Sequence, residues 1–187
     1  MQTTGKKNDV HQPTTGGWSV QNGELVCSTA QSGWLKSERQ YGDFVLRLEF
    51  KLQQDGNSGV YIRCPDSGHL SNVGMEIQII DEHGISAPGF RSRPGRLTGA
   101  IFGVVGSQQP PQRPIGEWNS MEIRCEGDNV EVMLNGTRTV SANMNQYPEL
   151  CNRPRSGYVG LSNLTGEAKG TAFRNIRIKN LSMKPSR

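Results

Sequence analysis

An alternating stretch of ten residues constrains the fold of this chain more than any other feature of its sequence. Between residues 43 and 52, apolar side chains fall at every second position. The apolar row is Phe44, Leu46, Leu48, Phe50 and Leu52, and the opposite row contains Asp43, Arg47, Glu49 and Lys51. A helix would spread these residues around its circumference, whereas a strand places each row on one face. The stretch therefore predicts a β-strand with one face in a core and the other in water.

The same signal recurs along the chain, and short turns separate its occurrences. Further strands are expected at 18–20, 24–27, 34–37, 57–63, 74–81, 98–103, 117–125, 128–134, 137–140, 157–162 and 171–180. The pairs Asn22-Gly23 and Asn135-Gly136 favour the positive φ angles of two-residue hairpin turns. The segment 141–151 has room for one short helical turn at most. These strands predict an all-β jelly-roll sandwich of two antiparallel sheets.

The composition agrees with this fold class. The chain has 187 residues with 23 Gly and 10 Pro, which suits many short strands joined by tight turns. We expect a flexible leader over residues 1–15, because that stretch is polar and aperiodic, and one jelly-roll domain over residues 16–187. A jelly roll with a polar face offers a groove for an oligosaccharide or glycoside ligand.

Charge and hydropathy limit the other partners. The net charge of +4 comes from scattered Lys and Arg residues rather than a basic stripe with aromatics, so nucleic acid is not expected as a partner. No apolar run approaches the roughly 18 residues of a membrane span. The start of the sequence also lacks the apolar middle of a signal peptide. The protein is therefore either cytoplasmic or an exported protein whose leader has been removed, and the sequence says nothing about its oligomeric state.

The sequence does not decide whether the four cysteines form disulfides or remain free thiols. Cys27, Cys64, Cys125 and Cys151 lie far apart, and none has the spacing of a zinc finger. They can form disulfides in an oxidising compartment, or remain as free buried thiols inside strands.

Two neighbouring strands, 57–63 and 74–81, are expected to share a polar face. If their apolar rows point to the core, the other face gathers Asn57, Tyr61, Arg63, Glu76 and Gln78. A guanidinium, a phenol, a carboxylate and two amides can together bind and process a polyhydroxylated ligand. This face is the predicted site.

The motifs along the chain resemble those of the bacterial 3-keto-disaccharide hydrolase domain family, whose fold is the concanavalin A-like jelly roll. The resemblance spans nearly the whole ordered chain, and its strength lies in the order of many short motifs. These are Gly17-Trp18, Asn22-Gly23-Glu24-Leu25, Tyr41-Gly42-Asp43-Phe44, the segments 57–63 and 76–81, Thr98-Gly99-Ala100-Ile101-Phe102, Gly116-Glu117-Trp118-Asn119, Leu134-Asn135-Gly136 and Phe173-Arg174-Asn175-Ile176. The resemblance implies cleavage of glycosides oxidised to a ketone at carbon 3, and a periplasmic or secreted protein.

The chain departs from the family pattern at one place. After Gly157-Tyr158-Val159-Gly160-Leu161 the family often continues with a Gln and then a His-Gly pair, whereas this chain has Ser162, Asn163 and Leu164. The missing histidine keeps a second reading open, in which the chain is a carbohydrate-binding jelly roll without catalysis. A third reading is a sandwich for protein interaction.

The chemistry of a 3-keto sugar suggests roles for the polar residues. The ketone acidifies the proton on carbon 2, so a base can remove it and the enolate can expel the group on carbon 1. Glu76 is the expected base, and Arg63 is expected beside it to stabilise the developing negative charge. Asp81 and His83 could supply an acid or base, or ligands for a divalent metal, which the sequence does not require. The binding roles fall to Tyr61 and Trp118 as sugar-contacting rings and to Asn57 and Gln78 as hydrogen-bonding amides.

Each of these residues also has a purely structural interpretation. Glu76 and Arg63 could form a cross-strand ion pair without a ligand. Trp118 could belong to the core, and His83 could be an ordinary solvated loop histidine.

Overall fold

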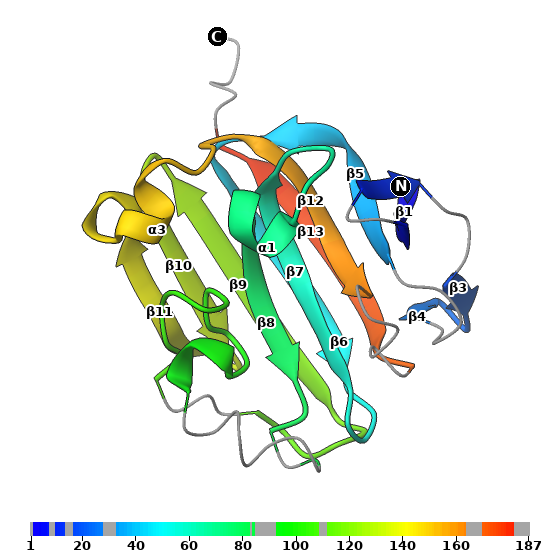
Figure 1. Cartoon of the computed structure of the whole chain (residues 1–187). Helices are drawn as coiled ribbons and strands as arrows, with labels where there is room; N and C mark the ends of the chain where they lie inside the picture. Colours follow the sequence, from blue (N-terminus) through cyan, green and yellow to red (C-terminus); the bar gives the residue numbers. More distant parts are fainter. Residues whose placement is uncertain are drawn as a thin grey trace, which may run out of the picture.

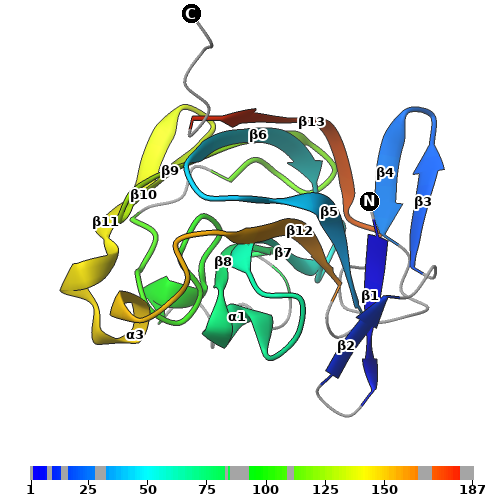
Figure 2. The ribbon, with the colours of Figure 1, turned by 90° about the horizontal axis from the view of Figure 1, so that it is seen from above.

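The computed structural model describes residues 2–7, 10–13, 17–27, 33–82, 84, 93–108, 112–163 and 170–181, the first two ranges by their backbone alone. Its strands form two stacked antiparallel sheets (Figures 1 and 2). The sheet nearer the viewer in Figure 1, here called the front sheet, has the strand order β2-β1-β5-β12-β7-β8. The other, the back sheet, has the order β11-β10-β9-β6-β13-β4-β3. This arrangement confirms the predicted all-β jelly-roll sandwich.

Most strands lie where the alternation predicted them. The front sheet contains β1 (Gln2–Lys7), β2 (Val10–Pro13), β5 (Gly33–Tyr41), β7 (Asn57–Cys64), β8 (Met75–Ile80) and β12 (Gly157–Asn163). The back sheet contains β3 (Trp18–Gln21), β4 (Glu24–Cys27), β6 (Phe44–Lys51), β9 (Trp118–Glu126), β10 (Asn129–Leu134), β11 (Thr137–Asn143) and β13 (Ala172–Asn180). The helical pieces are α1 (Leu70–Val73), η1 (Pro94–Arg96), η2 (Met144–Gln146) and α3 (Pro148–Cys151). Two short helical pieces thus follow β11, where one turn at most was expected.

The two predicted hairpin turns are confirmed by their backbone angles. Asn22 and Gly23 have φ values of 50° and 78°, and Asn135 and Gly136 have values of 49° and 81°. Positive φ at both central residues is the geometry that connects twisted antiparallel strands. These turns fix the β3–β4 and β10–β11 registers.

The apolar row of β6 forms the back-sheet side of the core. Its residues Phe44, Leu46, Leu48 and Phe50 are at most 2% exposed. They pack with the apolar rows of β7 and β8 from the front sheet in one contiguous cluster. Burial of each such side chain contributes about 1.5–3 kcal/mol. One core between the sheets therefore stabilises the sandwich.

A second, smaller apolar cluster lies on the outer face of the front sheet. Trp34 of β5, Tyr61 and Cys64 of β7 and Leu70 of α1 pack together there. Figure 2 shows α1 outside the front sheet, on the side away from the back sheet. The helix thus covers part of the face that was predicted to carry the site.

Two segments differ from the expectations. The leader expected over residues 1–15 contains β1 and β2, and β1 pairs with β5 through Thr3 and Leu35. Main-chain groups at a sheet edge accept a strand of almost any sequence, so a polar, aperiodic segment can pair there. The strand expected at 98–103 is reduced to bridges from Ile101 to Ile77 and Val105.

Candidate functional site

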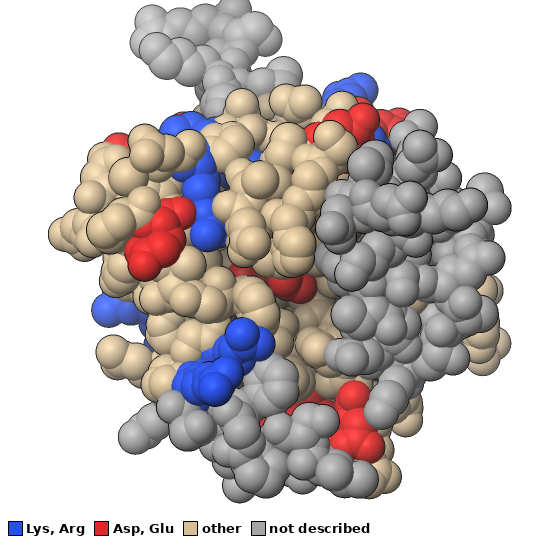
Figure 3. Space-filling view, in the orientation of Figure 1, with Lys and Arg blue, Asp and Glu red and all other residues tan. Residues whose placement is uncertain are grey.

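The register between β7 and β8 decides which side chains share the outer face of the front sheet. Tyr61 lies opposite Glu76, and Gly59 lies opposite Gln78. The residues between them belong to the core, so these four positions face outward. Figure 3 looks onto this face and shows acidic side-chain atoms in a hollow near its centre.

The carboxyl group of Glu76 lies among hydroxyl groups. Glu76 is only 8% exposed, and Ser71 Oγ donates a hydrogen bond of 2.8 Å to its Oε2. The side chains of Ser162 and Tyr61 also hydrogen-bond with it. Burial raises the pKa of Glu76 to about 7, and the three hydroxyl groups oppose part of this rise. Such a group exchanges a proton near neutral pH, as a general base must.

Glycines provide the space for this arrangement. A Cβ at position 59 would lie 2.5 Å from Glu76 Oε1, and a Cβ at position 160 would lie 2.4 Å from the ring of Trp34. Contacts this short do not occur between real side chains. Gly59 and Gly160 therefore allow Glu76 and Trp34 to lie flat on the sheet.

Two aromatic residues support the face from β5 and β7. Trp34 and Tyr61 are fully buried, and their rings meet edge to face with centroids 5.7 Å apart. Burial raises the pKa of Tyr61 well above its usual range, and the nearby Glu76 adds to the rise, so the phenol keeps its proton. The Nε1 atom of Trp34 is buried and has no hydrogen-bond partner. Tyr61 can act as a hydrogen-bond donor but offers no exposed ring for stacking on a sugar.

The two predicted amides lie together on the same face. Gln78 Nε2 donates to Asn57 Oδ1 over 3.5 Å, and Gln78 is 2% exposed while Asn57 is partly exposed. The structure thus brings four of the predicted site residues together on one face: Glu76, Tyr61, Gln78 and Asn57.

Arg63 does not join them, which corrects the predicted pairing with Glu76. Arg63 is fully buried and has a φ of 51°. The pairs Tyr61–Gly160 and Cys64–Tyr158 place one extra residue on β7 relative to β12. This β-bulge reverses the alternation, so the Arg63 side chain leaves the face of Tyr61.

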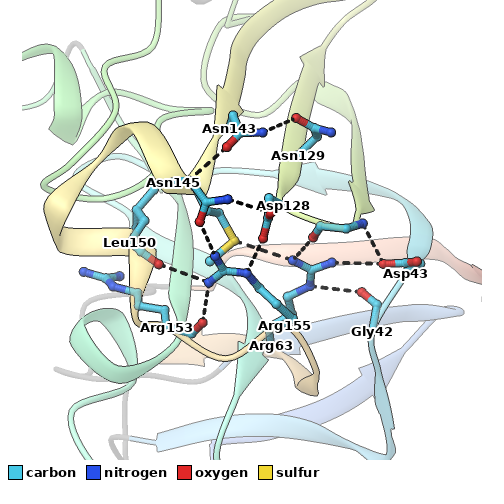
Figure 4. A network of polar contacts seen from close by, with 12 residues as sticks. Gly42, Asp43, Arg63, Asp128, Asn129, Asn143, Asn145, Leu150, Arg153 and Arg155 are labelled. Carbon is cyan, nitrogen blue, oxygen red and sulfur yellow. Dashed lines mark hydrogen bonds and ion pairs between the residues drawn. The ribbon is translucent and has the colours of Figure 1, made fainter.

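The guanidinium of Arg63 instead binds the turn from β5 to β6, which connects the two sheets, and the turn from β9 to β10 of the back sheet (Figure 4). It donates to the carbonyl oxygens of Gly42 at 3.0 Å and Gly127 at 2.9 Å, and it forms an ion pair with Asp43 at 3.3 Å. Asp43 also accepts a hydrogen bond of 2.9 Å from the Gly127 backbone. Arg63 is therefore a structural clamp between the two sheets.

Asp81 also has structural partners. It is 3% exposed, its Oδ2 accepts a hydrogen bond of 2.9 Å from the backbone of Asp55, and its own N–H donates to the Gly56 carbonyl. The carboxylate thus orders the loop between β6 and β7. His83 lies outside the described residues.

Trp118 lies on the outer face of the back sheet. It is partly buried, and two cations lie over its ring, Lys51 at 4.5 Å and Arg174 at 3.9 Å from the ring centroid. It therefore belongs neither to the core nor to the face of Glu76.

The structure adds two residues that the sequence prediction missed. Phe102 N–H donates to the Glu76 carbonyl, and the bridge between Ile101 and Ile77 makes Phe102 the direct neighbour of Glu76 on the same face. The partly buried ring of Phe102 carries the guanidinium of Arg96 at 4.9 Å. An aromatic ring and a cation beside Glu76 thus come from the segment after β8, which forms no regular strand. The sequence feature that could have indicated Phe102 was the motif from Thr98 to Phe102.

A metal site has no support among the residues that the structure describes. They contain no group of three or more His, Cys, Asp or Glu side chains placed to hold an ion. Within the same residues, no helix is long and apolar enough to cross a membrane.

The fold and the site together define a glycosyl hydrolase-like or carbohydrate-binding jelly-roll protein, and comparison with known proteins agrees. The chain belongs to the family described as the 3-keto-alpha-glucoside-1,2-lyase-like domain, which matches residues 2–179. No curated protein matches the chain.

Solved structures place it among carbohydrate-active folds. A presumed glycosyl hydrolase from Parabacteroides distasonis is 29% identical, with a TM-score of 0.78 over 88% of this chain and 90% of that one. A second presumed glycosyl hydrolase from the same organism is 22% identical, with a TM-score of 0.76 over 91% and 86%. The carbohydrate-binding module CBM66 of Bacillus subtilis shares the fold at 13% identity, with a TM-score of 0.59 over 87% and 91%.

Proposed function

We propose that this protein cleaves 3-keto-glycosides, with Glu76 as the base that removes the proton from carbon 2. The observation that carries the proposal is the buried carboxyl of Glu76, whose pKa of about 7 makes it able to accept a proton at neutral pH. The family to which the chain belongs supports the substrate class.

The reaction divides into two balanced steps. Glu76 takes the carbon 2 proton, and the electron pair of that C–H bond forms an enolate with the oxygen on carbon 3. The enolate collapses to the ketone, a double bond forms between carbons 1 and 2, and the aglycone leaves with the electron pair of its bond to carbon 1. The protonated Glu76 gives its proton to the aglycone anion. Water then adds to the double bond, with its oxygen on carbon 1 and one of its protons on carbon 2, and gives the 3-keto sugar.

Neighbouring groups suit the charges that develop. The enolate oxygen needs a donor, and Arg96 on the Phe102 ring and the Gln78 amide are the candidates beside Glu76. The phenol of Tyr61 stays protonated and hydrogen-bonds with Glu76, which holds the carboxyl in place. Phe102 offers an apolar surface to the sugar ring.

The direct test follows aglycone release from an aryl 3-keto-glucoside. We expect kcat/KM to rise with pH and to reach half its maximum near pH 7, because only ionised Glu76 accepts the proton. Glu76→Gln should lower kcat/KM by a factor of about 100 or more.

Glu117→Gln, which changes an exposed carboxyl in the turn before β9, is the matched control and should keep full activity. Equal turnover by wild type and Glu76→Gln would remove Glu76 as the base.

A non-catalytic carbohydrate-binding role is the second candidate. It is favoured by the absence, near Leu164, of the His-Gly pair that the family often has after Leu161. In that case the wild-type protein would bind the aryl 3-keto-glucoside in calorimetry and release no aglycone.

A further inference from the structure

The side chain of Arg153 connects α3 to α1. Its Nη1 donates hydrogen bonds of 2.8 Å to the Ser71 carbonyl and 2.6 Å to the Gly74 carbonyl. Its Nε donates to the Glu149 carbonyl of α3 at 2.7 Å. A guanidinium presents its donors in a rigid fork, so one side chain can fix several carbonyl groups in a set geometry. Arg153 therefore joins α1 to a segment that follows Ser71 by 82 residues.

The helix α1 depends on contacts with the rest of the protein for its position. It has a single turn, Leu70–Val73, and a helix this short is not stable on its own. Its N-cap residue, His69, makes no side-chain capping bond. Carbonyl groups at the end of a helix have no partner within it, and Arg153 supplies donors to two of them. Together with the packing of Leu70 in the smaller apolar cluster, Arg153 holds α1 on the sheet.

The segment that carries Arg153 is itself anchored. Leu150 of α3 is fully buried in the core between the sheets. Arg155 donates to the Leu150 carbonyl at 3.3 Å and to the Arg153 carbonyl at 2.6 Å (Figure 4). The same side chain forms an ion pair of 2.6 Å with Asp128, at the turn before β10. The backbone of Arg153 is thus fixed by the core and by a polar network.

Ser71 connects this fixed segment to Glu76. The carbonyl of Ser71 accepts from Arg153, and its Oγ donates the 2.8 Å hydrogen bond to Glu76 Oε2. Gly74, whose carbonyl also accepts from Arg153, lies two residues before Glu76. Within the residues that the structure describes, no hydrogen bond or ion pair joins Arg153 directly to Glu76. Arg153 can therefore reach the carboxyl through α1 and the Ser71 hydroxyl.

The titratable and charged groups nearest to Glu76 among the described residues come from β7 and from the segment after β8. Tyr61 and Cys64 of β7 interact with its charge, and burial raises the pKa of the phenol and of the thiol, so both stay protonated at neutral pH. Arg96 lies on the Phe102 ring beside it. None of these groups lies on α1, whose contribution to Glu76 is the Ser71 hydroxyl.

We propose that Arg153 is a positioning residue that holds the Ser71 hydroxyl against the Glu76 carboxyl. The inference deepens the proposed function, because it names a residue outside the front sheet that acts on the proposed base. Its consequence for turnover rests on that function, whereas its effect on Glu76 itself does not. Without Arg153, the ionised carboxyl loses the donor that α1 presents, so the pKa of Glu76 rises further.

The test is a pH titration of the Glu76 carboxyl by carbon-13 NMR in the full chain, with its resonance identified by its loss in Glu76→Gln. Arg153→Met keeps the length of the side chain and removes its donors. We expect it to lower the acid dissociation constant of Glu76 about tenfold, as Ser71→Ala should. The double variant should match Ser71→Ala alone, since both substitutions remove one hydrogen bond. Arg138→Met, at a side chain that is 61% exposed on β11, is the matched control and should change nothing.

A second variant covers the case in which Arg153→Met does not fold. Arg153→Lys keeps a cation, but one ammonium group cannot hold three carbonyls in the geometry of the guanidinium. We therefore expect it to lower the acid dissociation constant of Glu76 about threefold. The pH of half-maximal kcat/KM should rise in the same order, with Arg153→Met above Arg153→Lys and wild type lowest.

An unchanged titration of Glu76 in Arg153→Lys, and in Arg153→Met where it folds, would overturn the proposal even if both variants were less stable than wild type. A further tenfold fall on adding Arg153→Met to Ser71→Ala would overturn it as well, because Arg153 would then act through its charge. The titration needs no substrate, so a wild-type protein without turnover would contradict the proposed reaction and leave this result standing.

Discussion

At the scale of single residues, Glu76 shows how position determines chemistry. The chain contains 17 Asp and Glu residues, so the presence of a carboxyl group alone indicates no role. Glu76 differs because it is buried, lies over Gly59 and hydrogen-bonds with three hydroxyl groups. Desolvation makes the charged form costly, and this cost gives the group its affinity for a proton.

The raised pKa of Glu76 also predicts how stability depends on pH. Between about pH 4.5 and pH 7 the folded protein retains a proton that the unfolded chain has released, so the free energy of unfolding falls as pH rises. The full loss is about 3 kcal/mol for a shift of this size. Glu76→Gln should remove this dependence, so the free energy of unfolding of the variant should fall less than that of wild type between about pH 5 and pH 8.

Urea denaturation of both proteins at about pH 5 and pH 8 measures this difference. An equal change of stability between the two pH values in wild type and variant would show that the pKa of Glu76 is not raised in the folded state.

At the scale of elements, the bulge in β7 separates the clamp from the site. Tyr61 faces outward, and Arg63 faces the β5–β6 and β9–β10 turns although the two residues are two positions apart. One extra residue in β7 accounts for the change of face. Tyr61 of β7 thus belongs to the face of the proposed reaction, whereas Arg63 of the same strand connects the two sheets.

Arg63→Met should therefore destabilise the protein through this element. The substitution keeps the length of the side chain but leaves the carbonyls of Gly42 and Gly127 without the Arg63 donor and removes the cation from Asp43. Each buried carbonyl left without a donor costs about 1–3 kcal/mol, whereas Asp43 is 38% exposed and water can replace its contact with Arg63. The control is Arg47→Ala on β6, whose ion pair with Glu122 lies on an exposed face and should matter by about 0.5 kcal/mol or less.

Thermal and urea unfolding of both variants give the comparison. If Arg63→Met were as stable as wild type but had lost turnover, the structural role would be contradicted and a role of Arg63 in the reaction would be supported.

At the scale of the whole molecule, the fold was far easier to predict than the site. Rows such as Phe44 to Leu52 follow a period that only a strand can satisfy, and the Asn-Gly turns require positive φ. The same period correctly placed Glu76, Gln78 and Tyr61 on one face. It failed at Arg63, because a bulge in β7 depends on its pairing with β12 and leaves no periodic mark. Phe102 was missed because its position follows from a bridge to β8 rather than from a strand of its own.

The state of the four cysteines determines how the stability of the whole chain responds to a reducing agent. All four are free, and Cys27, Cys64 and Cys125 are buried. Burial raises the pKa of Cys27 to about 12 and that of Cys125 to about 12, which keeps both as unreactive thiols. We expect the melting temperature to be the same with and without a reducing agent, as measured by calorimetry. A lower melting temperature in the reducing agent would reveal a stabilising disulfide.

The contact between helix α1 and Glu76 shows how substitutions outside the sheets can change the pKa of the proposed base. Ser71 on α1 and Glu76 on β8 are five residues apart, and the hydroxyl of Ser71 lowers the proton affinity of the carboxyl. The connection between β7 and β8 is thus an adjustable part: substitutions in it can tune the acidity of the proposed base while the sandwich beneath stays constant. Related sequences can therefore acquire different working pH ranges by altering one short loop.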